Sequence, residues 1–502
     1  MERGEYSAAI DAFRKVAELD PSSVEAEYNL AAASILMGEY LFALERIDRA
    51  YRLLPENSRI LGLRGVILKR LGRIAEAEVS LQQAVDLDPV NADSLCNLAT
   101  VKKGAREFDA ALKLFDESLL HSPLHVESFI NRGNLWVECD NPLVAEKSFA
   151  RAIQLDSSRA DAWSNFASVA KSTGEIDVAA ERSYRACQLD ERHVDAHWNL
   201  GLYQLQLGQW DQGWPLYEWR LSRSPELQGA HLACPRWDGV SDLTGKRVLL
   251  TTEQGLGDSI QFFRFALVFA QRFDCAVGVQ APLVRLFSQM AVAPIPISDH
   301  ARSDEFDFHF PLMSLPLAFG LTPDDIPYAH QPYIRSLESN SDHWSQILGV
   351  PRRPRIGVMW SGGDNPKIRN RSIPLSLFSM LLGEEFDWVS LQKDLRADDA
   401  SLSARMSSLR HYGPQQADFA DAAGIIDNCD LVISVDTSIA HLAGAMGKEC
   451  WVLLPKIADW RWMLNRDDSP WYSSVRLFRQ ASEGDWLGLL MRVRAELLGR
   501  FF

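Results

Sequence analysis

Cysteine is scarce in this sequence, with seven residues among 502. The seven are scattered, and none belongs to a CxxC pair or to a cluster of cysteine and histidine. Disulfide frameworks and zinc sites both need such groupings, so neither is predicted and no metal is expected. This usage is typical of a reducing compartment and favours a cytoplasmic protein.

Long apolar runs and basic blocks are missing as well. No apolar run reaches the ~18 residues of a membrane span, and the opening Met-Glu-Arg-Gly-Glu-Tyr lacks the apolar segment of a signal peptide. The formal net charge is −15, and without a basic block no nucleic-acid partner is expected. A Walker A lysine motif and an aspartate-rich metal loop are also absent, which disfavours kinase or ATPase chemistry.

The first half of the chain contains a 34-residue repeat. The repeated alanine is expected where two antiparallel helices cross too closely for a larger side chain. The repeated glycine is expected at the end of the first helix of each pair, and the proline just after the second. The alanines are Ala9, Ala43, Ala77, Ala111, Ala145 and Ala179; the glycines are Gly4, Gly38, Gly72, Gly174 and Gly208, with Arg106 and Asp140 in the gaps; the prolines are Pro21, Pro55, Pro89 and Pro123.

These three sets are in phase and resemble the tetratricopeptide repeat (TPR), a helix–turn–helix unit that stacks into a superhelix with a concave face. The resemblance predicts an α-solenoid over residues 1–221. Residue 1 falls inside a repeat, after its first helix should have ended, so we expect the first unit to lack that helix and the native chain to begin further upstream. Trp210, Trp214 and Trp219 stand in the last unit, and we expect them to seal the solenoid against the next domain.

An asparagine recurs at a further repeat position. A carboxamide both donates and accepts hydrogen bonds, so a column of them can hold the backbone of an extended peptide whatever its sequence. The similar TPR superhelix of the nucleocytoplasmic O-linked N-acetylglucosamine transferase holds protein substrates in this way, which implies a protein acceptor here. The alternative is a common repeat residue that bonds within the solenoid. The residues are Asn29, Asn97, Asn131, Asn165 and Asn199, with Leu63 in the gap.

The second half alternates short apolar strands with helices, which predicts parallel sheets that bind ligands at the carboxyl ends of their strands. We predict a linker over 222–245, a first Rossmann-like lobe over 246–340, a second lobe over 353–480 and a final helix over 484–502. The predicted strands are Lys246–Thr252, Cys275–Gln280, Val292–Ile297, Phe306–Phe310, Arg355–Trp360, Trp388–Leu391, Leu431–Val435, Cys450–Leu454 and Val475–Phe478.

A glycine-rich loop, Gly255-Leu-Gly-Asp258, ends the first strand of the first lobe. Gly255 and Gly257 allow a ligand to approach the backbone, because neither carries a side chain. Asp258 is either the N-cap of the helix that follows or a general base.

In the second lobe Asp436, Thr437 and Ser438 follow a buried strand and precede a helix. Such a turn presents free backbone N–H groups and a positive dipole end to an anion. We interpret it as the cradle for the diphosphate of a nucleotide sugar, the alternative being an ordinary capped strand–helix unit.

Further donor-binding candidates follow other strands of the second lobe. Trp360 ends its first strand, Arg371 comes shortly after, and Lys393 ends the next strand. Cations at these loop tips would stabilise a diphosphate leaving group through charge-assisted hydrogen bonds, although each alone is more often a surface charge. Pro455–Trp462 ends a fourth strand at the same edge, and a tryptophan there could stack on a base or sugar.

Together the motifs of the second half resemble bacterial TPR–glycosyltransferase fusion proteins, a group that includes flagellin glycosyltransferases and is related to lipopolysaccharide heptosyltransferases. The resemblance implies a GT-B fold that needs no metal and no cofactor, with Asp258 as catalytic base. It also implies that the Asp436 turn and His441 bind the donor phosphates. The motifs are Trp214…Glu218-Trp-Arg220, Glu253-Gln-Gly-Leu-Gly-Asp258, Pro311-Leu-Met-Ser-Leu-Pro316, Arg371-Ser-Ile-Pro374, Ser390-Leu-Gln-Lys393, Asp418-Phe-Ala-Asp421, Val435-Asp-Thr-Ser-Ile-Ala-His-Leu-Ala-Gly444 and Asp459-Trp-Arg-Trp462 with Ser469-Pro-Trp-Tyr472.

We therefore expect an inverting, metal-independent glycosyltransferase that moves a sugar from a nucleotide sugar onto a protein held in the TPR groove, with flagellin as the expected acceptor. Two alternatives remain. The same enzyme could act on a lipid-linked or lipopolysaccharide glycan, or the chain could be a non-catalytic adaptor whose transferase lobes have decayed.

Overall fold

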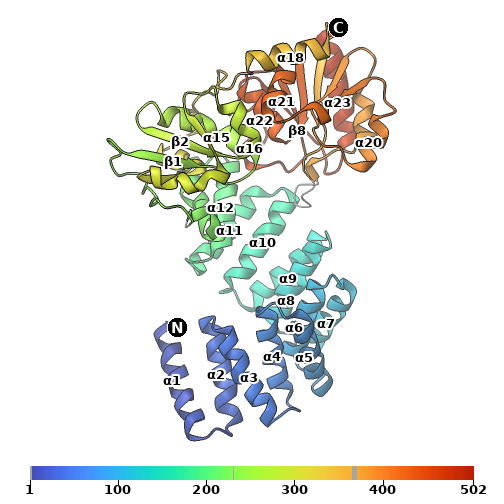
Figure 1. The fold of residues 1–502 in the computed structure, drawn as a ribbon. Coiled ribbons are helices and arrows are strands. Elements are labelled where there is room, and N and C mark those ends of the chain that lie inside the picture. Colours follow the sequence, from blue (N-terminus) through green and yellow to red (C-terminus); the bar gives the residue numbers. More distant parts are fainter. Residues whose placement is uncertain (1–2, 230, 364–369) are drawn as a thin grey trace. The chain divides into compact units, whose positions relative to one another are not determined.

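The structure is a computed structural model that describes residues 3–229, 231–363 and 370–502. The protein divides into two compact units (Figure 1). The first comprises Met1–Thr173 and Glu181–Glu191, and the second comprises Gly174–Ala180 and Arg192–Phe502. The first unit is helical, whereas the second contains two parallel β-sheets.

The first unit is a series of antiparallel helix pairs joined by short turns. In each predicted repeat the second helix ends two residues before the repeated proline, as at Leu53 before Pro55 and at Leu87 before Pro89. The helices are α1 (Arg3–Leu19), α2 (Val24–Met37), α3 (Tyr40–Leu53), α4 (Ser58–Arg70), α5 (Ile74–Leu87), α6 (Ala92–Gly104), α7 (Phe108–His121), α8 (Val126–Glu138), α9 (Pro142–Leu155), α10 (Ala160–Thr173) and α11 (Ile176–Leu189), the last of which spans the division between the units.

The repeated alanines lie where the paired helices cross. Ala77 of α5 is fully buried. On the facing helix α4, a Cβ built at Gly65 would lie 3.2 Å from the carbonyl oxygen of Ala77 and 2.4 Å from Leu81. The two backbones therefore approach too closely for a larger side chain, as the spacing predicted.

In this unit the repeated glycine position is left-handed after α2, α4, α6 and α8, whereas Gly4 lies within α1. Gly38 and Gly72 have φ of 79° and 75°, and the substitutes Arg106 and Asp140 have φ of 64° and 55°. The backbone thus keeps the helix-ending conformation even where glycine is replaced, although a Cβ makes that conformation costly.

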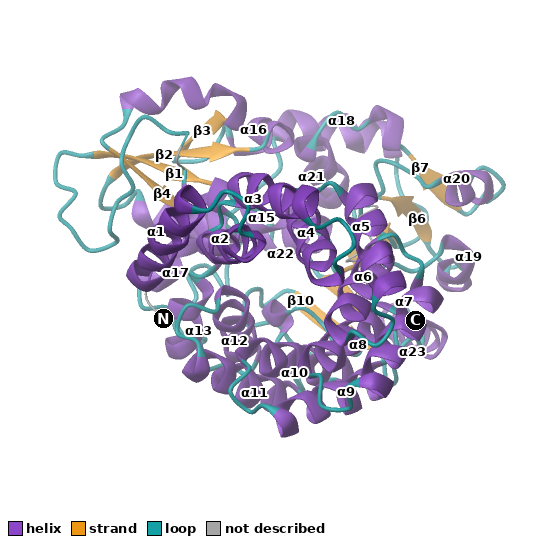
Figure 2. Ribbon diagram, turned by 90° about the horizontal axis from the view of Figure 1, so that it is seen from below, coloured by secondary structure: helices purple, strands orange, loops and turns teal. Residues whose placement is uncertain are grey.

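The first helices of successive pairs form the inner layer of the solenoid. α4 contacts α6, and α6 contacts α8, in addition to their contacts within pairs. Figure 2 shows α4, α6 and α8 on the inner side of the curve and α5, α7 and α9 on the outer side. Residues on the first helices are therefore the ones placed to meet a ligand in the groove.

The second unit begins with helices and continues into a four-stranded sheet of order β3-β2-β1-β4, in which every pair is parallel. The predicted strands of this lobe are confirmed to within about two residues. The elements are α12 (Val194–Gln206), α13 (Trp210–Tyr217), α14 (Arg220–Arg223), β1 (Arg247–Thr251), α15 (Leu256–Phe269), β2 (Asp274–Val279), α16 (Ala281–Phe287), β3 (Ala293–Pro296), β4 (Phe308–Pro311) and α17 (Leu315–Ala318).

The second sheet has six parallel strands in the order β10-β9-β8-β5-β6-β7. Counted from β5, this is the order 3-2-1-4-5-6 of the doubly wound dinucleotide-binding fold, whose ligand crevice lies where the order reverses, here between β5 and β8. The elements are α18 (Glu338–Leu348), β5 (Arg355–Met359), α19 (Leu375–Phe378), β6 (Asp387–Ser390), α20 (Ala397–Ser403), β7 (Leu409–His411), α21 (Phe419–Asp427), β8 (Leu431–Val435), α22 (Ser438–Ala445), β9 (Cys450–Leu454), β10 (Val475–Arg479) and α23 (Trp486–Phe501).

The solenoid bounds of 1–221 stay a prediction; the compact units divide within α11 and again before α12, so α12 and α13 belong to the unit that holds the sheets. The cause is aromatic packing. Trp210 stacks on Trp471 with ring centroids 5.1 Å apart, and Trp214 meets Trp460 edge-on at 5.6 Å. These tryptophans seal α13 against the α/β lobes as predicted, while Trp219 stacks on His197 of α12 instead.

The predicted linker over 222–245 packs against the first sheet. Its Trp237 is 7% exposed and meets Phe310 of β4 with ring centroids 4.9 Å apart. The backbone N–H of His309 in β4 donates to the carbonyl of Pro235. Within the residues that the structure describes, no helix is long and apolar enough to cross a membrane.

Candidate functional site

The glycine-rich loop of the first lobe and the Asp436 turn of the second lobe meet. The amino-terminal ends of α15 and α22 contact each other and lie side by side in Figures 1 and 2. A Cβ built at Gly257 would lie 3.0 Å from Cδ2 of His441 and 3.3 Å from Cα of Ser438. The missing side chain of Gly257 therefore serves the packing of one helix end on the other.

Asp258 holds two partners in this arrangement. Its Oδ2 accepts the backbone N–H of Gly255, the N-cap residue of α15, at 2.8 Å. Its Oδ1 forms an ion pair with Arg461 of the second lobe. Asp258 is therefore the third residue of α15 and not its N-cap, and its side chain keeps 20% exposure.

Arg461 is a site residue that the sequence analysis did not single out, although it lies within the motif Asp459-Trp-Arg-Trp462. Its Nη1 donates to Asp459 at 2.8 Å and its Nε to Gln261 at 2.9 Å. Burial opposes its charge, but the carboxylates of Asp258 and Asp459 hold the pKa of Arg461 above its usual value. Arg461 therefore stays charged between the lobes.

The contacts continue as an ion-pair chain that runs Asp258–Arg461–Asp459–Arg371–Asp436. Nη2 of Arg371 lies 3.1 Å from Oδ2 of Asp459, and Nη1 lies 2.9 Å from Oδ2 of Asp436. Burial by itself would raise the pKa of Asp459, but the positive charges of Arg461 and Arg371 hold it well below its usual range. Burial raises the pKa of Asp436, because Arg371 only partly offsets its loss of water. The predicted residues Asp258, Arg371 and Asp436 are thus brought into one network.

Thr437 and Ser438 form the turn into α22. Thr437 is the N-cap, and its Oγ1 accepts the backbone N–H of Ile439 at 3.3 Å. Ser438 is the first helical residue. The free end of α22 consequently points toward the first lobe, with a dipole that favours an anion.

His441 lies in the wall behind this turn. It is 5% exposed, its ring stacks on Trp462 at 5.3 Å between centroids, and its Nδ1 lies 3.1 Å from the hydroxyl of Tyr472. Burial lowers the pKa of His441 to about 3. The ring is neutral near pH 7 and brings no positive charge to a phosphate.

Two predicted donor-binding residues lie away from the network. Trp360 is fully buried, and its indole N–H donates to Asp399 at 3.0 Å. Its ring offers no face to a ligand, so the structure contradicts the prediction; burial could not be read from its position at a strand end. Lys393 is exposed, and its Nζ donates to the carbonyl of Ala417 at 2.7 Å.

The carboxyl edge of the first sheet is filled by a side chain from the preceding helices. Arg220, 2% exposed, reaches Glu253 after β1 at 2.8 Å and Ser314 after β4 at 2.8 Å. Burial opposes its charge, but Glu253 and Glu218 hold the pKa of Arg220 above its usual value. The point where this sheet reverses its strand order is therefore filled by an internal ion pair.

Two further arginines hold the lobes together. Arg264 of α15 is fully buried and donates to the carbonyl of Trp471 at 2.8 Å, with its guanidinium 4.7 Å from the ring of Tyr472. Arg285 of α16 makes a two-pronged contact with Asp418 at 2.8 and 2.7 Å. The carboxyl edge between β5 and β8 therefore lies in a tightly joined pair of lobes.

The asparagines lie on the first helices of the repeats and are all half-buried. Nδ2 of Asn131 lies 3.6 Å from Sγ of Cys96. For the carboxamides of Asn29, Asn97 and Asn165, the described part of the chain supplies no hydrogen-bond partner. Asn199 occupies the same repeat position on α12, in the second unit.

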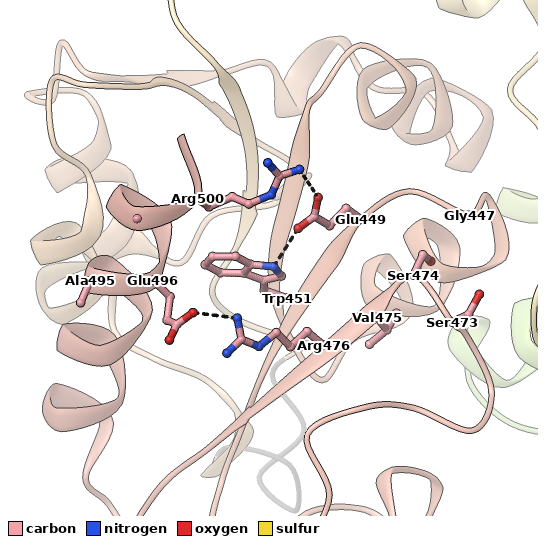
Figure 3. Close-up of a pocket in the computed structure, with 11 residues that line it drawn as sticks. Gly447, Glu449, Trp451, Ser473, Ser474, Val475, Arg476, Ala495, Glu496 and Arg500 are labelled. Carbon is pink, nitrogen blue, oxygen red and sulfur yellow. Dashed lines mark hydrogen bonds and ion pairs between the residues drawn. The ribbon is translucent and has the colours of Figure 1, made fainter. Parts of the chain in front are cut away.

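A cavity of 780 Å³ lies at the opposite edge of the second sheet (Figure 3). Two ion pairs cross it, Arg476–Glu496 at 2.8 Å and Arg500–Glu449 at 3.2 Å. Glu449 precedes β9, so this is the amino-terminal edge of the strands, where parallel sheets rarely bind ligands. Among the described residues, no cluster of three His, Cys, Asp or Glu could hold a metal ion.

Comparison with known proteins supports the helical half. The tetratricopeptide repeat family matches residues 58–91. The N-terminal region is a TPR-type helical solenoid, followed by a region with parallel sheets. A crystal structure of a TPR protein from Thermus thermophilus aligns with 36% of this chain and 100% of its own, at 18% identity and a TM-score of 0.34.

Two known proteins are similar in sequence to this chain, one over almost its whole length and one over less than a third of it. Protein FlbA of Caulobacter vibrioides is 24% identical over 533 residues, which cover 98% of this chain and 87% of that protein. Human protein O-mannosyl-transferase TMTC3 is 26% identical over 161 residues, which cover 29% of this chain and 18% of that protein. The similarity to FlbA therefore extends through both halves of the chain.

Proposed function

We propose that this protein is a glycosyltransferase of GT-B type that moves a sugar from a nucleotide sugar to a protein acceptor, with flagellin as the expected acceptor. The observation that carries the proposal is the meeting of the Asp258 loop and the Asp436 turn at the carboxyl edges of two parallel sheets. The strand order of the second sheet, which reverses beside Asp436, supports a nucleotide site there. The local likeness to a protein O-mannosyl-transferase supports the same reaction class.

In this proposal the second lobe stabilises the leaving group. The end of α22 and the guanidinium of Arg371 face the diphosphate, and both favour the negative charge that grows as the bond to the sugar breaks. Arg371 supplies this charge without a metal ion. It must first exchange its carboxylate partners for phosphate oxygens.

Asp258 is assigned the role of general base on the facing lobe. It takes the proton of an acceptor hydroxyl while the hydroxyl oxygen attacks the anomeric carbon. The bond from that carbon to the diphosphate breaks on the opposite side, and the nucleoside diphosphate leaves with the bonding electrons. The anomeric configuration is inverted.

The solenoid is assigned to the protein acceptor. Carboxamides on its inner layer, three of which find no hydrogen-bond partner among the described residues, suit the backbone of an extended peptide. Mass spectrometry of flagellin from a strain without the gene tests the acceptor, and unmodified flagellin is expected. Unchanged flagellin together with altered lipopolysaccharide would favour the lipid-linked glycan instead.

A thermal-shift panel of UDP, GDP, CDP and ADP, each beside its own monophosphate and beside inorganic phosphate, tests the donor site directly. A ligand that binds only the folded chain raises its melting temperature by mass action. We expect at least one nucleoside diphosphate to stabilise the full chain more than its monophosphate or inorganic phosphate does, and Arg371→Gln to abolish the difference. No shift with any nucleotide would contradict the proposal.

One observation favours the second candidate, a non-catalytic adaptor. Asp258, Arg371 and Asp436 are all occupied by partners within the chain. A chain that binds flagellin peptides but no nucleotide in the same panel would be such an adaptor, with the solenoid as its working surface.

A further inference from the structure

We propose that Arg461 is a positioning residue that couples the anion site at Arg371 to the carboxylate of Asp258, so that a bound donor loosens Asp258 for proton transfer. The inference rests on the proposed function. It depends on the ion-pair chain, which joins a helix end of the first lobe to a strand end of the second.

Arg461 is fixed on every side. Nη2 pairs with Asp258, Nη1 with Asp459 and Nε with Gln261, and the guanidinium lies 4.5 Å from the ring centroid of Trp460. Its side chain is 8% exposed. A planar guanidinium held in this way shares its charge between two carboxylates, so a stronger contact with one weakens the contact with the other.

Arg371 lies on the other side of Asp459 in the same ion-pair chain. Each of its Nη atoms is engaged by a carboxylate, Asp436 on one side and Asp459 on the other. A diphosphate that pairs with Arg371 must compete with both. Once Arg371 pairs with the phosphate, Arg461 is the remaining cation paired with Asp459. Asp459 then draws the guanidinium of Arg461 away from Asp258.

Thermodynamic linkage fixes the reverse effect. If an anion at Arg371 loosens Asp258, then removing the charge of Asp258 must strengthen binding of that anion by the same factor. Without Asp258, Arg461 is free to hold Asp459, and Arg371 is released for the phosphate. Asp258 is linked to Arg371 through Arg461 and Asp459, and a variant of Arg461 separates this route from the direct Coulomb effect of removing the charge of Asp258.

Isothermal titration of the full chain with UDP, GDP, CDP and ADP measures this coupling. We expect Asp258→Asn to bind the preferred nucleotide about fivefold more tightly than the wild-type chain. In an Arg461→Gln background the same substitution should have no effect. If Arg461→Gln does not fold, Asp459→Asn replaces it as the background that breaks the chain.

Arg285→Gln is the matched control, because it removes another Arg–Asp contact between the lobes and leaves the ion-pair chain intact. Its nucleotide affinity should equal that of the wild-type chain. An affinity unchanged by Asp258→Asn, or a gain that survives in the Arg461→Gln background, overturns the inference alone. If no nucleotide binds the wild-type chain, the proposed function fails together with it.

Discussion

Gly257 of α15 lies directly against His441 of α22, with room for no more than a hydrogen between them. A Cβ at Gly257 would come within 3.0 Å of the imidazole. The ring cannot easily withdraw, because Trp462 stacks on it and Tyr472 is hydrogen-bonded to it. The contact between the two helix ends therefore depends on this glycine.

The first prediction concerns that contact. Gly257→Ala should lower the free energy of unfolding by about 1–3 kcal/mol, because the added methyl group overpacks the junction. Chemical denaturation of the full chain measures it. Gly499→Ala is the control, since a Cβ there meets nothing within 4 Å; the alanine should leave stability equal or slightly higher.

The second prediction concerns the proposed base. Asp258→Asn should reduce sugar transfer by about 10²–10⁴-fold, because the amide cannot take a proton from the acceptor. Asp274→Asn is a fair comparison, as Asp274 lies on the same lobe with its side chain 72% exposed. Full transfer activity in Asp258→Asn, with the melting temperature also recorded, would remove Asp258 from the mechanism.

The third prediction concerns the two repeat positions where glycine is replaced. Arg106→Gly and Asp140→Gly should each stabilise the solenoid by about 1 kcal/mol, because glycine adopts their left-handed backbone without strain. Gly38→Ala, at an equivalent position, should change stability in the opposite direction. Urea unfolding followed by circular dichroism provides the comparison.

The fourth prediction concerns acid. His441 has a pKa of about 3 in the folded chain against 6.5 for the free group, so the unfolded chain binds its proton first as pH falls. Its contribution to stability is complete above pH 6.5 and decreases below it, by at most about 1.4 kcal/mol per pH unit. Between pH 6.5 and 5, His441→Gln should therefore lose less stability than the wild-type chain. Equal slopes would show that His441 takes up its proton without unfolding.

The fold could be predicted where local pattern determines structure. Leu431–Val435 and Cys450–Leu454 were predicted with their observed bounds, because strands buried on both faces are continuous apolar runs. β7 was missed, since Leu409–His411 has only three residues and a single apolar one. The GT-B assignment stays a prediction.

The site could be predicted only in part. Parallel strands end at a common edge, which is why the loops of Asp258 and Asp436 could be expected there. Arg461 could not, because its partner Asp258 is 203 positions away and no spacing rule links them. The prediction for Trp360 was wrong for a related reason. The sequence does not show whether a tryptophan that follows a strand faces a ligand or packs in the core.

The ion pair between Arg220 and Glu253 has a consequence for how the chain can be divided. The side chain of Glu253 is 2% exposed and follows β1 of the first sheet, whereas Arg220 comes from the helices before the sheet. A fragment that starts at β1 would leave the carboxylate of Glu253 without its counter-ion Arg220. A piece that keeps this ion pair must therefore include α14, and the helices from α12 onward belong to the same compact unit as the sheets.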